Sequence, residues 1–308
     1  MSPDGMWSIG ELAGHAGVTV KTVRFYSDRG LLPEAGRSAG GHRRYGPEAL
    51  DRLRLIRSLR TLDLPVPDVG RVLDSEDALE DVVAGQLREL GTQLAALRWR
   101  EAALQLVRDC PAGERADRLR LIGAVSAPPS TAALARFWRR WLPPRLPARV
   151  LSAVVDQAVP EPPADPTPAQ VLAFARLHAL VSGPCTGASG VSDWQPAAHR
   201  TGGGYRPAVL YEGLGEAYAL ASPDLRAQRQ PYDGEALDCF VAAYARSRGT
   251  RDTPAFRREL SGQLAADPRI DLYWQLAAEL YGPSRPTPGA AHDWLCAALD
   301  AGIARSAA

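Results

Sequence analysis

Lysine is almost missing from this sequence. Lys21 is the only one in 308 residues, so every other basic side chain except histidine is an arginine. Most positive charge therefore sits on planar guanidinium groups, which bind phosphates and base edges in a bidentate manner. A GC-rich genome favours the same bias, so the bias alone identifies no function.

Long apolar runs and closely spaced cysteines are also lacking. No apolar run approaches the ~20 residues that a membrane-spanning helix needs, and the first residues lack the blocks of a signal peptide. Cys110, Cys185, Cys239 and Cys296 lie far apart without CxxC spacing, which is typical of reduced thiols. These absences predict a cytoplasmic protein with no membrane partner.

Known catalytic and metal-binding motifs are not found either. There is no G-x-S-x-G, no Walker loop and no H-E-x-x-H, and the glycines at 202–204 follow no strand. We therefore expect no enzyme, no catalytic residue and no cofactor. A thiophilic metal needs at least two thiolates, and the loop after Cys110 offers none, so we expect an inert thiol and no metal site.

The chain is long enough for two or more domains, and its net charge of +1 hides a local excess of one sign. Between Arg37 and Arg60 there are seven arginines against Glu48 and Asp51. Such a stripe is typical of polyanion binding. A solvated helix face has the same composition, so the stripe alone does not decide between them.

The first 32 residues have the pattern of two short helices joined by a turn. Ser8 with Glu11 forms a capping box for the first helix, which Gly17 ends, and Thr19 can cap the second. In the second helix we expect Val20, Val23 and Phe25 to face the core. The side chains expected to project outward are Lys21, Thr22, Arg24 and Tyr26. The alternative for Tyr26 is that it covers the edge of the core.

A basic hairpin and a further helix pair follow. Gly40-Gly41 suits a tight turn, and the returning strand would be His42, Arg43, Arg44 and Tyr45. Pro47 suits the first turn of a helix from about Glu48 to Leu62, and a last helix ends near Leu73. The layout predicts a helix that enters the DNA major groove beside a wing that contacts phosphates.

These blocks together resemble the winged-helix DNA-binding domain of the MerR family of bacterial transcription regulators. The matching residues are Ile9–Ala13, Gly17-Val18, Thr22–Tyr26, Gly30–Leu32 and Gly41–Tyr45. The resemblance implies a DNA-binding set of Thr19, Lys21, Thr22, Arg24, Tyr26, Arg37, His42, Arg43, Arg44, Tyr45 and Arg60. Two departures are His42, in place of an aromatic residue, and Asp63-Leu64-Pro65, in place of a Gly-aromatic pair.

A proline-free stretch from Glu76 to Asp109 predicts one long helix. Its apolar residues are spaced as the a/d seam of a coiled coil, at Val83, Leu87, Leu90, Leu94, Leu97 and Leu104. The seam could pack on the chain's own C-terminal half. The family resemblance implies instead an antiparallel coiled coil between two copies, and hence a homodimer.

Beyond about residue 126 the pattern predicts helices only, at about 131–142, 148–159, 168–181, 207–221, 234–248, 254–266, 269–281 and 290–303. A long Gly- and Ser-rich loop is expected at 183–204. Aromatic residues concentrate in this half, and as a group they suit a pocket for a drug-sized ligand. Ordinary helix packing is the alternative for each one. The candidate ligand-binding residues are Trp138, Trp141, Trp194, Tyr211, Tyr218, Tyr273 and Trp274, with Asp193, Glu212, Glu216 and Asp271 as polar anchors.

We therefore predict a mainly all-α protein in four parts. These are a winged helix-turn-helix domain (1–75), a dimerisation helix (76–110), a linker (111–127) and a helical effector domain (128–308). The predicted function is a homodimeric transcription regulator that binds a pseudo-palindromic promoter operator. As the resemblance implies, it would distort that operator for RNA polymerase holoenzyme when a small molecule binds. The alternative is a DNA-binding head fused to an enzymatic or drug-sequestering domain.

Overall fold

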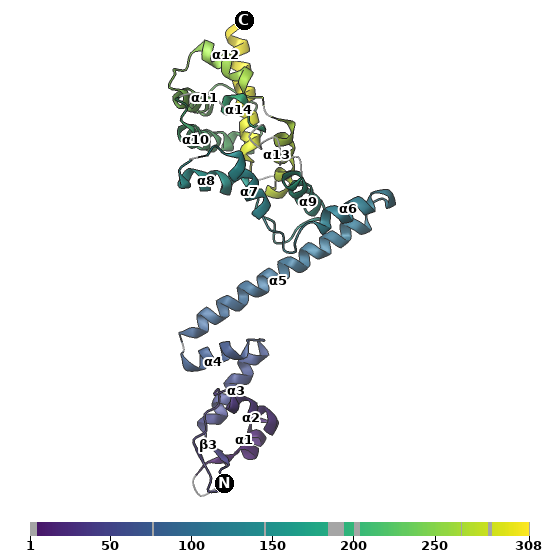
Figure 1. The fold of residues 1–308 in the computed structure, drawn as a ribbon, viewed down its shortest axis with the longest axis vertical. Helices are drawn as coiled ribbons and strands as arrows, with labels where there is room; N and C mark the ends of the chain where they lie inside the picture. The colour runs from purple at the N-terminus through teal and green to yellow at the C-terminus, as the bar shows by residue number, and fades with distance from the viewer. Residues whose placement is uncertain are drawn as a thin grey trace. The chain divides into compact units, whose positions relative to one another are not determined.

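The structure is a computed structural model that describes residues 5–75, 77–144, 146–183, 194–199, 204–265, 267–282 and 285–307. The chain divides into two compact units, Met1–Thr92 and Gln93–Ala308. Both units are mainly helical, and Figure 1 follows the helices in chain order. The predicted fold class, mainly α with an N-terminal winged helix-turn-helix, is confirmed.

The first unit is a small helical domain with one three-stranded sheet. Its strands are β1 (Trp7–Ser8), β2 (Gly36–Arg37) and β3 (Arg43–Tyr45), in the order β1-β3-β2 with antiparallel pairing. The strand β1 was not predicted. The helices are α1 (Ile9–Ala16), α2 (Val20–Asp28), α3 (Glu48–Thr61) and α4 (Val66–Asp74).

Local capping explains where the first two helices begin and end. The Glu11 amide donates to Ser8 Oγ at 3.3 Å and the Ser8 amide donates to Glu11 Oε2 at 2.7 Å, which completes the predicted capping box. Thr19 caps α2 by accepting from the Thr22 amide at 3.1 Å. Gly30 follows α2 with φ +74°, a left-handed conformation that glycine adopts without steric cost.

The long helix α5 (Ala78–Arg108) contributes to both units. Near its start Val82 is buried in the core of the first unit. Further along, one face of the helix joins the core of the second unit through Trp99, Ala102 and Leu106. The Trp99 indole also donates to the Pro163 carbonyl at 3.0 Å. The end of α5 is therefore anchored in the second unit.

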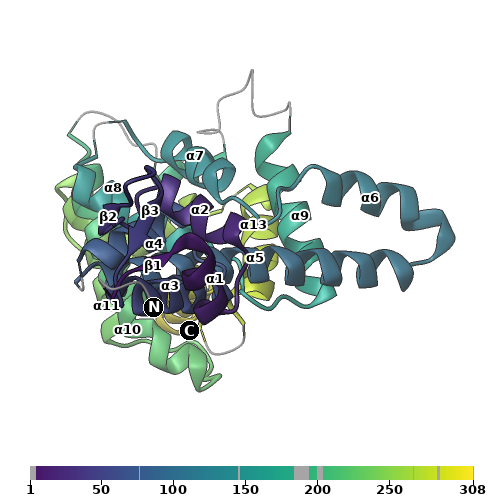
Figure 2. The same ribbon diagram turned by 90° about the horizontal axis from the view of Figure 1, so that it is seen from below.

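The segment 111–127 is more ordered than the predicted linker. It contains a 3-10 turn, η1 (Ala112–Glu114), and the helix α6 (Arg115–Gly123). Figure 2 shows α6 running back from the end of α5 towards α9, and Ile122 packs against the core of the second unit. Residues 115–123 thus belong to the second unit.

The second unit is built from helices that match the predicted ranges closely. They are α7 (Ala132–Trp141), α8 (Ala148–Ala158), α9 (Pro168–Ser182), α10 (Pro207–Arg226), α11 (Glu235–Arg248), α12 (Pro254–Gln263), α13 (Pro268–Tyr281) and α14 (Pro288–Ala307), with a 3-10 turn η4 (Ala197–His199). The helix α14 runs through the unit (Figure 1) and contacts α10, α11, α12 and α13. Most of the predicted loop at 183–204, including Asp193 and Cys185, lies outside the described residues.

None of the described helices contains an apolar stretch long enough to cross a membrane.

Candidate DNA-binding surface and ligand cavity

The exposed face of α2 presents two basic side chains. Lys21 and Arg24 are exposed and three residues apart, so they lie on one side of the helix. In the part of the chain that the structure describes, neither has an ion-pair partner, so both are available to a polyanion. Thr19 and Thr22 lie at the start of the helix, where their hydroxyls are 2.9 Å apart.

The neighbouring aromatic pair is oriented opposite to the prediction. Tyr26 is 9% exposed and belongs to the core, whereas Phe25 is 42% exposed. The reason is helical geometry: Tyr26 lies three residues after buried Val23, but Phe25 lies only two after it and points elsewhere. The spacing to Val23 was the signal that could have identified Phe25 as the surface residue. The Arg29 guanidinium lies 4.6 Å from the centre of the Phe25 ring.

The wing carries charged residues that are partly paired. Arg43 contacts Asp28 at 2.6 Å and Glu34 at 3.3 Å, and Arg37 contacts Glu34 at 2.9 Å. Arg44 is half-buried in β3, opposite Ser8 and Gly36. His42 is exposed at the tip. Phosphate binding at the wing therefore competes with these carboxylates at Arg37 and Arg43, whereas His42 is open to solvent.

Two residues predicted to contact DNA have hydrogen-bond partners inside the domain. Tyr45 is fully buried, and its hydroxyl donates to Ser27 Oγ at 3.0 Å. Tyr45 is the last residue of β3 and pairs with Trp7 of β1, and this pairing turns the Tyr45 ring towards the core. The Arg60 guanidinium donates to the Leu64 carbonyl at the corner between α3 and α4. The family resemblance implied the DNA contact of both residues, and helical spacing predicted that Arg60 points outward. Neither could show the strand pairing of Tyr45 or the contact of Arg60 at this corner.

The second unit contains a cavity of about 410 Å³. That volume is within the range of small-molecule sites. The walls come from helices distant in sequence: Trp138 and Trp141 from α7, Tyr211 and Tyr218 from α10, and Trp274 from α13. Helix α14 contributes a polar part of the wall with His292, Asp293, Cys296 and Asp300.

Five of the seven aromatic residues predicted to bind a ligand line this cavity, and two do not. Trp194 instead packs against Phe137 with ring centres 5.2 Å apart and beneath the Arg269 guanidinium at 4.2 Å. The Tyr273 hydroxyl donates to the Ala158 carbonyl at 2.8 Å. Of the predicted polar anchors, Asp271 lines the cavity, whereas Glu212 forms an ion pair with Arg149 at 2.5 Å. Glu216 is exposed and is not among the lining residues.

Two histidines in the cavity wall are held in their neutral form. Burial lowers the pKa of His199 to about 3, assisted by His292 and Arg248, and lowers the pKa of His292 to about 4. His199 bridges the hydroxyls of Tyr211 at 3.1 Å and Tyr244 at 2.9 Å. His292 Nδ1 lies 2.9 Å from the Tyr218 hydroxyl. These histidines were not among the predicted ligand-binding residues.

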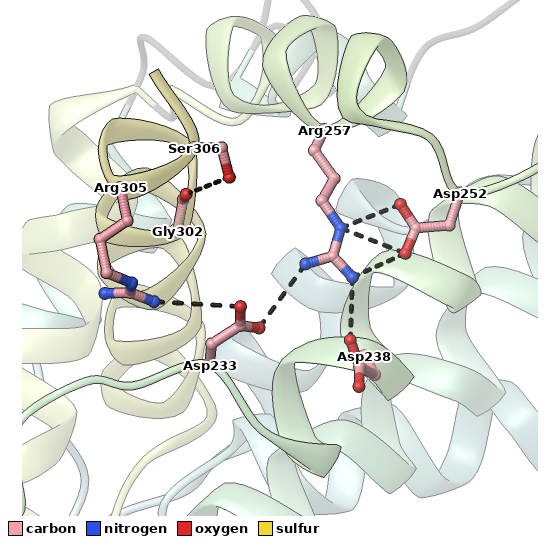
Figure 3. A network of polar contacts seen from close by, with 7 residues as sticks. All are labelled: Asp233, Asp238, Asp252, Arg257, Gly302, Arg305 and Ser306. Atoms are coloured by element: carbon pink, nitrogen blue, oxygen red, sulfur yellow. Dashed lines mark hydrogen bonds and ion pairs between the residues drawn. The ribbon is translucent and has the colours of Figure 1, made fainter. Parts of the chain in front are cut away.

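A charged cluster holds the helices behind the cavity together. Figure 3 shows Arg257 of α12 between three carboxylates. It contacts Asp252 at 2.7 Å, Asp238 of α11 at 2.8 Å and Asp233 at 3.7 Å, and Arg305 of α14 also contacts Asp233. Hydrogen bonds from Arg257 to Asp252 raise the pKa of the guanidinium, so the cation is permanent. Ser261 of α12 further donates to Asp300 of α14 at 2.6 Å.

Cys110 is buried after the end of α5, and its thiol donates to the Val107 carbonyl at 3.2 Å. Among the described residues there is no group of three His, Cys, Asp or Glu side chains placed to hold a metal ion.

Comparison with known proteins assigns the N-terminal unit to a family. Residues 7–76 match the family model described as MerR HTH family regulatory protein. The chain is 37% identical over 118 residues to an HTH-type transcriptional regulator of Pseudomonas aeruginosa, and the match covers 36% of this chain and 89% of that protein. The chain belongs to the MerR family. Residues 7–76 carry the helix-turn-helix domain of that family, and the Pseudomonas relative is by its name a transcriptional regulator.

Other MerR-family relatives match over shorter stretches of the chain. Nodulation protein NolA of Bradyrhizobium sp. (strain NC92) is 40% identical over 89 residues, and the activator TipA of Streptomyces coelicolor is 47% identical over 72 residues. The matches cover 29% and 23% of this chain, but only 38% of NolA and 28% of TipA. The chain thus matches well under half the length of these relatives.

A solved structure is also similar to this MerR-family chain. It is HiNmlR, a family member lacking the sensor domain and bound to promoter DNA, with 27% identity and a TM-score of 0.23 over 32% of this chain and 90% of that one. The family model ends at residue 76, so the cavity lies outside the part of the chain that it describes.

Proposed function

We propose that this chain is a homodimeric, ligand-responsive transcription regulator that binds a pseudo-palindromic operator within a promoter. The observation that carries the proposal is a row of exposed leucines along α5. Leu87, Leu90, Leu94, Leu97 and Leu104 are between 49% and 71% exposed, whereas the face bearing Trp99 and Leu106 is buried. One helix thus packs on its own chain with one face and presents the other to solvent.

The spacing of these leucines matches a coiled-coil seam, which an identical helix of a second copy can cover. Val83, at the start of the seam, is half-buried. Burying each leucine side chain contributes about 1.5–3 kcal/mol, so the row can stabilise a dimer. An antiparallel pairing would place two DNA-reading heads about a two-fold axis, which suits an operator with two half-sites.

On each half-site, α2 would lie in the major groove with Lys21 and Arg24 as its principal contacts. The exposed ring of Phe25 would add apolar contact with a thymine methyl group or a sugar. Thr19, Thr22 and the wing residues Arg37, His42, Arg43 and Arg44 would bind backbone phosphates. Tyr26, Tyr45 and Arg60 would act indirectly, by holding the domain in shape.

A small molecule in the cavity of the second unit would be the effector. Because the end of α5 lies in the core of that unit, a ligand that shifts the core also shifts the helix that carries the dimer seam. The dimer would then bend or untwist the promoter so that RNA polymerase holoenzyme can engage it, at a deformation cost that DNA contacts offset. Such coupling requires that the ligand bind one dimer geometry more tightly than the other.

The seam is tested by replacing Leu90 and Leu94 with glutamate in the full chain. We expect the wild type to sediment as a dimer and the double variant to dissociate at least about 100-fold more readily, because two carboxylates would be buried at the interface. Leu119→Glu is the matched control: it changes an exposed leucine on α6, 52% exposed and outside the seam, and should leave the dimer intact. A wild-type monomer at micromolar concentration would contradict the proposal.

Footprinting tests the operator. The wild type should protect an inverted repeat in the region upstream of its own coding sequence or elsewhere in the genome, and the Leu90/Leu94 variant should protect neither half at the same concentration. Protection of a single half-site by the monomeric variant with unchanged affinity would show that dimerisation is not needed for binding.

A further inference from the structure

The cavity of the second unit has an unbalanced charge. Among the described residues that line it, three are aspartates and none is lysine or arginine. Asp300 accepts a hydrogen bond from Ser261, but Asp271 and Asp293 have no hydrogen-bond or ion-pair partner in the described part of the chain. Among the described residues, no side chain is therefore paired with these two carboxylates, which are both exposed.

These two carboxylates are close enough to influence one another. Burial raises the pKa of both carboxyl groups. The negative charge of Asp267 raises the pKa of Asp271 further, and the negative charge of Asp271 raises the pKa of Asp293 further. Asp271 lies in the first turn of α13, where the helix dipole favours a negative charge. A positive charge placed between them would relieve this repulsion.

None of the described residues that line the cavity supplies such a charge. His199 and His292 are both neutral because they are buried, and burial raises the pKa of the Cys296 thiol to about 12. As far as the described lining goes, a positive group beside these carboxylates would come from a ligand.

The rest of the lining suits flat rings. Trp138 lies between two other indoles, with ring centres 4.9 Å from Trp141 and 5.2 Å from Trp274. Trp274 follows Asp271 by three residues on α13, so an indole and a carboxylate share one helix face. Electron-rich faces of this kind attract a cation as well as an apolar ring.

We propose that this cavity binds an organic cation that carries an aromatic ring system. Its positive charge would face Asp271 and Asp293, and its rings would pack against Trp138 and Trp274. This inference rests on the proposed role of the second unit as the effector domain, and it names the chemical class of the effector.

The test uses three probes of one shape: 10-methylacridinium, acridine at a pH where it is neutral, and acridine-9-carboxylate. Binding to the full chain without DNA is followed by tryptophan fluorescence and calorimetry. We expect the methylacridinium cation to bind at least about tenfold more tightly than the carboxylate, with neutral acridine between them.

Asp271→Asn and Asp293→Asn should each reduce the preference for the cation several-fold, while the affinity for neutral acridine changes less than about twofold. Glu279→Gln is the matched control: it removes the same charge from an exposed position on α13 that does not line the cavity, and should change nothing. Circular dichroism verifies that each variant is folded.

Equal binding of all three probes, binding of none, or a cation preference unchanged in both aspartate variants would overturn the inference. These outcomes are separate from a failure of the proposed function. Cation binding without any effect on operator occupancy would contradict the effector role alone. An operator response to acridine-9-carboxylate but not to the cation would contradict the ligand class alone.

Discussion

The two units use aromatic and charged residues in opposite ways. In the first unit the charged groups of α2 face solvent and the aromatic rings of Tyr26 and Tyr45 are core. In the second unit the aromatic rings of Trp138, Trp141 and Trp274 line a cavity, and the unbalanced carboxylates face the same cavity. The candidate major-groove residues of the first unit follow one another along a single helix. The residues that line the cavity come from helices far apart in the sequence.

The same difference predicts how each unit responds to change. The surface of the first unit can lose a side chain without unfolding, because its functional groups contact nothing essential to the core. The cavity of the second unit is part of the core, so changes there alter stability and binding together. Three changes test this contrast. They are a fall in pH, the removal of a charge from α2 and the addition of one methyl group at the cavity wall.

The largest expected effect is acid destabilisation of the second unit. His199 and His292 have folded pKa values of about 3 and 4, below the 6.5 of an unperturbed histidine. Between pH 6.5 and about 4, these histidines are therefore protonated in the unfolded chain but not in the folded unit. The free energy of unfolding consequently falls as the pH falls. From pH 7 to 5 the loss is about 2 kcal/mol for each histidine, or about 4 kcal/mol together.

Denaturant titrations at pH 7 and pH 5, followed by tryptophan fluorescence, measure this loss. Every tryptophan except Trp7 lies in the second unit, so the signal reports on that unit. His292→Gln should remove about half of the pH dependence, since only His199 would remain. His15 lies in α1 of the first unit, so His15→Gln is the control and should leave the dependence of the second unit unchanged. Equal stability at both pH values would refute the burial argument.

A smaller effect is expected for operator binding by variants of α2. Arg24→Ala removes one major-groove or phosphate contact from each half-site, which should weaken binding by about 1–3 kcal/mol and reduce its salt dependence. Phe25→Ala should weaken binding at unchanged salt dependence, because no charge is lost. Both variants should keep the melting temperature of the wild type, since both side chains are exposed.

Arg120→Ala provides the control for Arg24→Ala. Arg120 is an exposed arginine of α6 that is ion-paired with Asp117 and remote in sequence from α2. Its loss should leave operator affinity and salt dependence unchanged. If Tyr26→Phe weakened binding more than Phe25→Ala, the assignment of the surface ring on α2 would be wrong.

Local signals in the sequence predicted most of the helices. Ser8 with Glu11, Thr19 and Gly30 mark helix ends because their effect depends on neighbours within four residues, and the structure has them in those roles. The helices α7 to α14 begin within two residues of the predicted positions, mostly next to a proline. What patterning missed was β1, since a two-residue strand exists only through its pairing with β3.

Sites were predicted less completely than helices, for a related reason. The outward position of Lys21 and Arg24 follows from helical spacing, but Tyr45 and Arg60 depend on contacts with Ser27 and the Leu64 carbonyl elsewhere in the fold. In the cavity, aromatic composition predicted five lining residues. It could not identify His199 or His292, because their role depends on burial and on tyrosines 12 to 74 residues away.

The last comparison, which includes the smallest expected effect, adds a methyl group at one of two places in the cavity wall. A Cβ at Gly289 of α14 would lie 2.1 Å from Cγ of Trp274, so Gly289→Ala forces the indole or the helix to move. Overpacking of this kind costs about 1–3 kcal/mol. Gly215 of α10 lines the same cavity, and a Cβ added there would meet nothing within 4 Å, so Gly215→Ala should instead stabilise by under about 1 kcal/mol. Thermal melts of the two variants should shift in opposite directions, and only Gly289→Ala should alter the fluorescence of Trp274 when 10-methylacridinium binds. If both variants shifted the melting temperature upward, the close packing of Trp274 on α14 would be refuted.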